Sequence, residues 1–350
     1  MHGTRLAPLP HQLVALERGL ARNPVRLLLA DEVGLGKTIE AGLIHAELKA
    51  RGRVRRTLVI APKGVQLQWA AEMADHFDEE FVRVGPGGVP FDAGIDPWST
   101  FDQVICSLDA VKPLTARAGW SPQRVEEHNR LRVDALVDAG WDLVIIDEAH
   151  HVAGSDPSVA RHQLARRLAE CAPNVLLLSA TPHPGKSDAF ARLLGLLDDR
   201  FIHGLEATRD TVGPLVVRAD KRRTTDQDGN PLFLPRTTTL RSIPYGERHI
   251  EQQLYDAVTE YVRHGYKQAL AQNRPAVGFL VLLMQRLASS STAAIHAALE
   301  RRHAAVLTEG TQLRLFPEHA EDWGDLSGEE QVAALNNAMG AAWGNELRVG

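Results

Sequence analysis

Residues 27–44, LLLADEVGLGKTIEAGLI, constrain the fold of this chain more than any other stretch of its sequence. The four apolar residues 27–30 predict a short buried strand, and residues 39–44 predict the first turns of a helix. The glycine-bearing turn between them would direct backbone N–H groups, and the positive end of the helix dipole, at a phosphate group. Lys37 adds a mobile positive charge for the phosphates, and the Thr38 hydroxyl can hold Mg²⁺.

This turn is a relaxed form of the phosphate-binding loop. The strict pattern G-x-x-x-x-G-K-[ST] requires glycine at position 31, where this chain has Asp31. Ordinary glycine turns also contain G-x-G-K-T, so the interpretation depends on the rest of the chain. The residues that we expect to contribute to a nucleotide site here are Asp31, Glu32, Gly34, Leu35, Gly36, Lys37, Thr38 and Ile39.

Strand and helix patterns alternate along the first two thirds of the chain. The expected strands after the first are 57–61, 81–84, 103–107, 142–146 and 175–178, and the expected helices are 10–22, 63–77, 121–139, 158–170 and 189–197. Such alternation predicts an α/β fold with a parallel sheet and helices on both faces. Ligands of these sheets bind at the carboxyl ends of the strands. Since GLGKT, DEAH and SAT each follow a strand, one crevice is expected to hold all three.

Asp147 and Glu148 directly follow the apolar strand 142–146. Asp147 can hold Mg²⁺ together with Thr38, and Glu148 can orient or deprotonate an attacking water. The alternative, an acidic helix cap beside a solvent histidine, is disfavoured by the preceding strand and by the presence of GLGKT. The pair therefore predicts phosphoanhydride hydrolysis.

Other polar residues near these motifs have both a structural and a functional interpretation. Gln12, at the start of the first helix, can offer an adenine edge one donor and one acceptor, although a surface glutamine is the simpler reading. Ser179 and Thr181 can bridge from the carboxylates to neighbouring loops, or can simply form a turn. Trp69 is interpreted as core. The adjacent His150 and His151 lack Cys or His partners at ligand spacing, so we reject a metal site there.

Composition limits the remaining possibilities. The net charge of −5 argues against a simple basic nucleic-acid binder, so any such contact must use local positive surface. Two basic clusters are candidates, although solvated faces are the favoured reading: Lys49, Arg51, Arg53, Arg55 and Arg56, and Arg218, Lys221, Arg222 and Arg223. No apolar run reaches membrane-spanning length, and the two cysteines lie in apolar contexts. A cytoplasmic protein without membrane contact is expected.

At this point the motifs, taken in order, resemble those of the superfamily-two helicase-like ATPases. Gln12, DEVGLGKT at 31–38, APKGVQLQW at 61–69, DEAH at 147–150 and SATP at 179–182 carry the resemblance. The form DEVGLGKTIEAGLI is similar to the Swi/Snf-type branch, notably its bacterial members related to the polymerase-associated recycling ATPase. More loosely, the chain resembles the Swi/Snf-like helicase subunit of the DISARM phage-defence system.

The resemblance implies ATP and Mg²⁺ as cofactors and assigns a role to each motif. Gln12 would read adenine, the 31–39 turn would hold phosphates and metal, and the DEAH carboxylates would carry out hydrolysis. Ser179, Ala180 and Thr181 would couple hydrolysis to movement. Members translocate on double-stranded DNA, and the residues expected to line the DNA track are Pro62, Lys63, Gln68 and Ser107.

The chain departs from the family in one respect. No second strand–helix series and no Q-x-x-G-R-x-x-R stretch follow residue 301, so a second RecA-like lobe is expected in a longer chain or another subunit. We expect a RecA-like ATP-binding lobe over 1–217, a basic, proline-containing linker over 218–245, a helical extension over 246–304 and a polar acidic insertion or tail over 305–350.

Three functions remain open from the sequence. The leading hypothesis is the first motor lobe of a DNA-dependent ATPase that translocates on or remodels double-stranded DNA complexes, with phage defence as one setting and weak activity alone. The second is a strand-separating helicase or restriction-system motor of the same superfamily. The third is a nucleotide-sensing scaffold that binds ATP without turnover.

Overall fold

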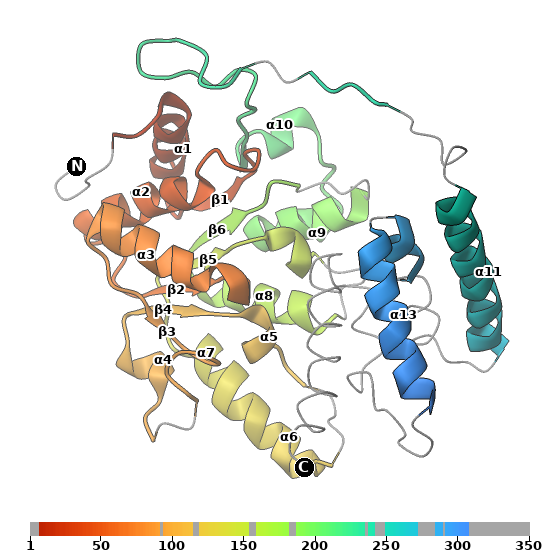
Figure 1. Cartoon of the computed structure of the whole chain (residues 1–350). Coiled ribbons are helices and arrows are strands. Elements are labelled where there is room, and N and C mark those ends of the chain that lie inside the picture. The colour runs from red at the N-terminus through yellow and green to blue at the C-terminus, as the bar shows by residue number, and fades with distance from the viewer. Residues whose placement is uncertain are drawn as a thin grey trace. The chain divides into compact units, whose positions relative to one another are not determined.

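The chain forms two compact units, residues 1–236 and 237–350, which are described separately (Figure 1). A computed structural model describes residues 7–91, 94–114, 119–153, 159–181, 187–234, 237–241, 249–271, 284–289 and 291–307. Among these residues, no helix is both long and apolar enough to cross a membrane.

A seven-stranded sheet in which every pairing is parallel forms the centre of the first unit. Its strand order is β3-β4-β2-β5-β6-β1-β7. The strands are β1 (Arg26–Leu29), β2 (Thr57–Ile60), β3 (Val82–Arg83), β4 (Gln103–Cys106), β5 (Leu143–Ile146), β6 (Asn174–Leu178) and β7 (Val216–Val217). The predicted fold class, an α/β parallel sheet of the RecA-like type, is confirmed.

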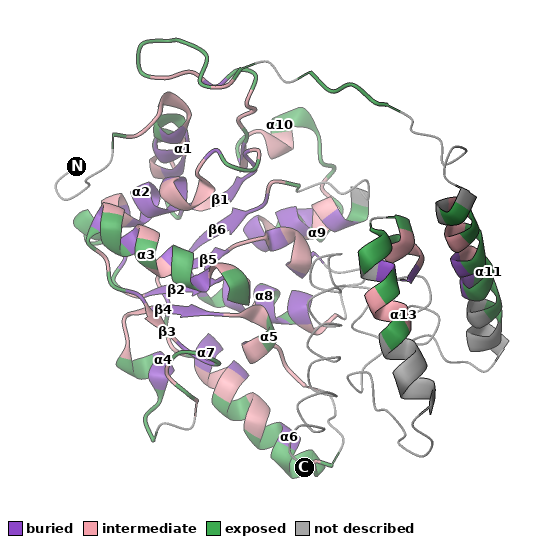
Figure 2. Ribbon diagram, viewed as in Figure 1, coloured by how far each residue is buried: buried purple, intermediate pink, exposed green. Residues whose placement is uncertain are grey.

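Helices cover both faces of this sheet because alternate strand residues point to opposite sides. Leu27 and Leu29 of β1 pack into the layer that contains α1 (Pro10–Leu20), α2 (Lys37–Ala50) and α3 (Gln66–Phe77). Leu28, between them, packs into the opposite layer with α8 (Ala160–Cys171) and α9 (Ser187–Leu197). Buried residues accordingly concentrate on the strands and on the inner sides of these helices (Figure 2).

Shorter helical segments complete the first unit. They are α4 (Pro97–Thr100), α5 (Leu108–Val111), α6 (Pro122–Asn129), α7 (Ala135–Val137) and α10 (Arg209–Val212), the 3₁₀ segments Lys63–Val65, Ala149–Val152 and Asp199–Phe201, and the π-helical turn Arg130–Asp134. The helix expected over 121–139 is therefore built from α6, the π turn and α7. The short helices α4, α5 and α10 were not expected.

The second unit is helical in its described parts. It contains α11 (His249–Ala271), a helical segment over 284–289 and α13 (Thr292–Leu307), with a small apolar cluster of Val258, Val262, Met284 and Ile295. Of the helical extension expected over 246–304, residues 249–271, 284–289 and 292–304 are described and are helical. No strand follows β7 among the described residues. The expected acidic insertion lies outside them from residue 308 onward.

The first unit extends beyond the lobe boundary that the sequence suggested. Residues 218–234 follow β7 and pack with the lobe, and the compact unit ends at Arg236 rather than at residue 217. Apolar periodicity gave no sign of this because the segment is polar and is held mainly by hydrogen bonds.

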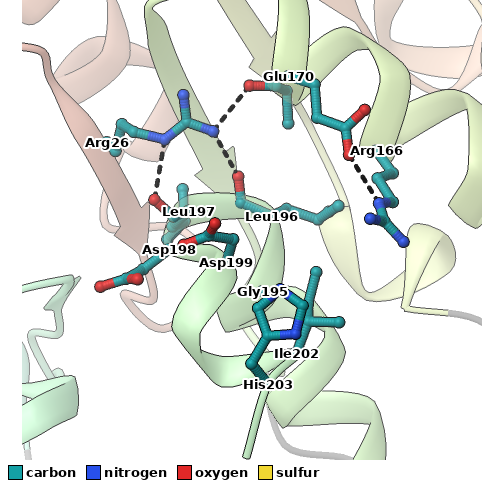
Figure 3. A pocket seen from close by; sticks show the side chains of 11 residues that line it. Arg26, Arg166, Glu170, Gly195, Leu196, Leu197, Asp198, Asp199, Ile202 and His203 are labelled. Carbon is teal, nitrogen blue, oxygen red and sulfur yellow. Dashed lines mark hydrogen bonds and ion pairs between the residues drawn. The ribbon is translucent and has the colours of Figure 1, made fainter. Parts of the chain in front are cut away.

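At the amino edge of the sheet, a cavity of about 430 Å³ is lined by Arg26, Arg166, Glu170, His203 and neighbouring residues (Figure 3). The guanidinium of Arg26 donates to the carbonyl oxygens of Ala169, Leu196 and Leu197 at 2.7–2.8 Å, and to that of Ala172 at 3.2 Å. Burial lowers the pKa of Arg26. Because these carbonyls occupy the guanidinium, Arg26 joins α8 and α9 to β1 and does not offer the cavity a free cation.

We expect Arg26→Met to destabilise the first unit by about 3 kcal/mol, because it leaves several partly buried carbonyls without a donor. The loss should appear in the free energy of urea unfolding followed by tryptophan fluorescence. Arg166→Met is the matched control. Arg166 lines the same cavity but forms an exposed pair with Glu170 at 2.7 Å, so its loss should cost less than ~0.5 kcal/mol. Equal effects of the two substitutions would contradict this account.

Candidate active site

The strand order brings the sequence motifs together at one edge of the sheet. The turn 31–38 follows β1, the SAT motif follows β6 and the DEAH motif follows β5, and these three strands are adjacent. On the other side of β5 lie β2, which precedes 61–69, and β4, which precedes Ser107. Since all pairs are parallel, every motif emerges at the carboxyl edge, as the sequence predicted.

The 31–38 turn has the backbone conformation that a phosphate site requires. Gly34 and Gly36 have φ angles of 83° and 85°, in the left-handed region that favours glycine. Within the described residues, no hydrogen bond uses the N–H of either glycine. The first N–H groups of α2, which begins at Lys37, have no intrahelical acceptor. This row of free donors fits the phosphates of a nucleotide.

Lys37 lies across this turn. Its ammonium donates to the backbone carbonyl of Asp31 at 3.0 Å, which holds the side chain against the loop. Its positive charge lowers the pKa of Asp147 and of Glu148, although in each case it is a lesser influence. The ammonium is thus close enough to act on the DEAH carboxylates as well as on the loop.

Below the turn lies a buried carboxyl pair, Asp31 and Glu40, each with no exposed surface. Asp31 Oδ1 accepts the Ala219 N–H at 2.6 Å, while Asp31 Oδ2 and both oxygens of Glu40 accept no hydrogen bond from the described residues. Burial first, and the neighbouring Asp31 second, raise the pKa of Glu40 to about 10. Glu40 is therefore protonated at neutral pH, and its proton can be shared with Asp31.

Gln12 closes the turn from the side of α1. Its Nε2 donates to the carbonyl of Leu35 at 3.2 Å, and its Oε1 accepts the N–H of Leu9 at 3.0 Å. A Cβ added to Gly36 would lie 2.6 Å from Gln12 Nε2, so this approach is available only to glycine. Gln12 therefore contacts the phosphate loop, and its amide has a backbone partner on each side.

Asp147 ends β5 with both carboxylate oxygens hydrogen-bonded. Trp69 Nε1 donates to Oδ2 at 2.8 Å, and the Glu148 N–H donates to Oδ1 at 2.8 Å. Burial raises the pKa of Asp147, while these two bonds act in the opposite direction. A half-buried carboxylate that retains free lone pairs, and that lies close enough to Lys37 for the ammonium to lower its pKa, has the chemistry of a Mg²⁺ ligand.

Glu148 is connected to the SAT motif through a histidine. Glu148 has a φ of 48°, and its Oε2 lies 3.2 Å from His150 Nδ1. The same nitrogen lies 3.2 Å from the hydroxyl of the buried Ser179. The contact with His150 holds the pKa of Glu148 below its ordinary value. Glu148 is therefore kept ionised, as a residue that orients a water must be.

The remaining predicted residues lie at the same edge but make fewer contacts with the site. Ala180 is half-buried and Thr181 is exposed. Lys63 and Gln68 are exposed after β2, where Gln68 donates to Glu72 at 2.7 Å, and Pro62 is half-buried. The Ser107 hydroxyl accepts the Ala110 N–H at 3.3 Å and so caps the N-terminus of α5, which is a structural role.

Three residues of this site were missed as functional from the sequence: Trp69, His150 and Glu40. Trp69 is indeed core, with 1% of its surface exposed, but a buried indole N–H needs an acceptor, and that need was the available signal. For His150 the sequence suggested only a metal ligand or a solvent-exposed histidine. Glu40 lies within the predicted helix 39–44. A carboxyl residue among apolar neighbours was the signal that could have identified it.

The first basic cluster has a structural explanation, in agreement with the favoured reading. It lies before β2, at the amino edge, and each member has a partner. Arg55 pairs with Asp102 at 3.2 Å, Arg51 with Glu47 at 2.8 Å, and Lys49 with Glu79. Arg53 and Arg56 donate to carbonyl oxygens of Arg22, Ala139, Trp98 and Phe101.

Fold and site together define a P-loop nucleotide-binding lobe of the RecA-like class. The SNF2-related domain family matches residues 11–207, and the chain belongs to this family of Swi/Snf-type helicase-like ATPases.

Several known proteins are similar to this chain in sequence or in structure. Over 208 residues the chain is 43% identical to the RNA polymerase-associated protein RapA of Yersinia pestis (strain Pestoides F), covering 57% of this chain and 20% of that protein. RapA of Yersinia pseudotuberculosis (serotype O:1b, strain IP 31758) gives the same values. The chain thus spans about one fifth of the length of these relatives. The Sulfolobus solfataricus SWI2/SNF2 ATPase core in complex with dsDNA matches with a TM-score of 0.49 and 16% identity, covering 89% of this chain and 62% of that one.

We expect Glu40→Gln to stabilise the first unit above neutral pH. The folded-state pKa of Glu40, about 10, lies above its unfolded value of 4.5. Between these values the folded state binds the extra proton, so the free energy of unfolding falls as pH rises. A glutamine amide can donate to Asp31 Oδ2 without a proton from solvent.

The measurement is urea unfolding at pH 6 and pH 8. Relative to the variant, the unmodified chain should lose on the order of 2 kcal/mol between the two values. Glu47→Gln, on the same helix with Glu47 paired to Arg51, should leave the pH dependence unchanged. A Glu40→Gln variant with the parent's pH slope would show that Glu40 is ionised in the fold.

Proposed function

We propose that this chain is the first motor lobe of a DNA-dependent ATPase, which hydrolyses ATP and couples this to movement on double-stranded DNA. The observation that carries the proposal is the convergence of GLGKT, DEAH and SAT on the adjacent strands β1, β5 and β6. The connection from Ser179 through His150 to Glu148 strengthens it. A scaffold that only binds nucleotide has no need of an ionised carboxylate beside the phosphate loop.

The chain's own residues divide the work of binding. Gln12 recognises adenine, and the free N–H groups of Gly34, Gly36 and the first turn of α2 receive the phosphates. Lys37 leaves the Asp31 carbonyl and neutralises the phosphate charge. Mg²⁺, when bound with ATP, screens charge on the phosphates, and Thr38 and Asp147 are the residues that would hold it.

Hydrolysis is assigned to Glu148. The carboxylate accepts a proton or hydrogen bond from the attacking water and thereby orients it toward the terminal phosphate. His150 keeps Glu148 ionised and, through Ser179, relates its position to the SAT turn after β6. A movement of the SAT residues, Ser179, Ala180 and Thr181, therefore changes the position of Glu148. We propose that hydrolysis and motion are coupled in this way.

DNA contact is proposed for the exposed residues after β2 and β4, namely Lys63 and Gln68, with Pro62 and Ser107 beside them. The full motor requires the second RecA-like lobe, supplied by a longer chain or by another subunit. RapA's name places that relative with RNA polymerase. We propose double-stranded DNA complexes as the general target, with phage defence as one cellular setting.

The first test is steady-state ATP turnover by the chain, with and without duplex DNA. The expected result is weak turnover that DNA stimulates, because one lobe lacks the arginines that a second lobe supplies. Lys37→Ala should abolish ATP binding. Glu148→Gln should retain ATP binding and lose at least ~100-fold in turnover.

Two outcomes would contradict the proposal. Turnover that survives Glu148→Gln would exclude the assigned mechanism. ATP binding without any turnover, even after the missing lobe is restored, would favour the nucleotide-sensing scaffold.

The role of Trp69 is tested by the pH dependence of the same turnover. Trp69→Phe removes the donor to Asp147 Oδ2, a bond that lowers the pKa of Asp147. Without it the carboxyl protonates at a higher pH, so the acidic limb of the rate profile should move upward by about one pH unit. Trp141→Phe, which removes a buried indole N–H bonded to Leu136 away from the site, should leave this limb in place. The same shift in both variants would indicate general destabilisation.

A further inference from the structure

Residues 218–234, which we call the strap, follow β7 and lie against the phosphate loop. Asp31 Oδ1 accepts the Ala219 N–H at 2.6 Å, and Glu32 Oε2 accepts the Lys221 N–H at 3.1 Å. In return, the Glu32 N–H donates to the Ala219 carbonyl at 3.2 Å. Both acidic residues that open the DEVGLGKT motif are therefore engaged by the strap, which fixes its start beside the loop.

The strap is folded back on itself. The Asp226 carboxylate accepts the N–H groups of Asp228 at 2.9 Å and of Asn230 at 2.8 Å. The Leu232 N–H donates to the Thr224 carbonyl at 3.0 Å, and Thr224 is 4% exposed. These bonds close a turn and return the end of the strap to a position beside its start.

This arrangement directs the ammonium of Lys221 at the phosphate loop. A Cβ added to Gly34 would lie 3.5 Å from Lys221 Nζ and 3.9 Å from its Cε, so the lysine passes over the Cα of Gly34. The same Nζ lies 5.3 Å from the ring centre of Phe233, within the range of a cation–π contact. Among the described carboxylates, none lies within ion-pair distance of Lys221. A cation thus stands over a turn that is built for anions, without a carboxylate partner.

We propose that Lys221 is a second phosphate-binding cation of the nucleotide site and donates to the polyphosphate of ATP and ADP alongside Lys37. This proposal rests on the proposed ATPase function and adds a binding residue from outside the matched family region. The lysine ammonium is a strong donor for phosphate oxygens, and Phe233 limits its conformations before the nucleotide arrives. The basic run at 218–223 then has divided roles, since Lys221 faces the loop while its neighbours Arg222 and Arg223 are exposed.

The test measures binding of ATP, ADP and adenosine to the full 350-residue chain by calorimetry, with fluorescent ATP displacement for the weak ligand. Lys221→Ala should weaken ATP and ADP binding about ten-fold or more and leave adenosine binding unchanged, because only the phosphates meet the ammonium. Lys221→Arg keeps the charge and should stay within about three-fold of the parent. Arg222→Ala, a loss of the same charge one residue further on, should have no effect.

Every other outcome contradicts the proposal, and each indicates a different explanation. If Lys37→Ala abolishes ATP binding while Lys221→Ala matches the parent, Lys221 is not a nucleotide ligand and the proposed ATPase stands. If Lys221→Ala instead weakens binding of duplex DNA in the absence of nucleotide, the ammonium serves DNA phosphate. Equal weakening of ATP and adenosine would indicate a structural effect of the strap. If the parent chain binds no ATP, this proposal and the proposed function both fail.

Discussion

The parallel pairing of β1 between β6 and β7 is the constraint on which the rest of the lobe depends. The register Leu29↔Leu178 aligns the ends of β1 and β6, so the phosphate loop and the SAT turn leave the sheet side by side. The pairing of β1 with β7 brings residues 217–221 across the start of the same loop. One buried strand of four leucine-rich residues therefore positions three functional segments that are distant in sequence.

Two ionisable side chains of α2 are buried in their uncharged forms. Glu40 keeps its proton, and the fully buried His45 on the same helix has its pKa lowered by burial to about 4 and stays neutral. Both groups cost stability when they are compared with their solvated forms, yet α2 retains them five residues apart. Glu40 and His45 therefore add no charge near the loop, and the charged side chains that a bound nucleotide would meet are those of Glu32, Lys37, Asp147, Glu148 and the strap.

The sequence was sufficient for the fold of the lobe and for the edge of the sheet at which the motifs meet. Apolar runs such as 143–146 and 175–178 mark buried parallel strands, and the motifs that follow them identify the functional edge. Two-residue strands such as β7 carry no periodic signal. The strap was read as a linker because its attachment depends on single hydrogen bonds, from Ala219 to Asp31 and from Lys221 to Glu32, which leave no pattern in composition. Local pattern likewise could not reveal that Trp69 reaches the carboxylate of Asp147 or that His150 reaches the hydroxyl of Ser179, since these contacts join residues 78 and 29 positions apart.

The contact between Gln12 and the loop has a consequence for selectivity. In the proposed ATPase, the bonds to Leu35 and Leu9 use one N–H and one oxygen lone pair of the Gln12 amide, so its second N–H and its remaining lone pair are available to the base. Such a pair of bonds yields a small net gain, on the order of 1 kcal/mol each. A base whose edge does not match this donor and acceptor forms neither bond. The lobe can thus prefer adenine while holding it weakly, which suits a motor that must discard its spent nucleotide at every step.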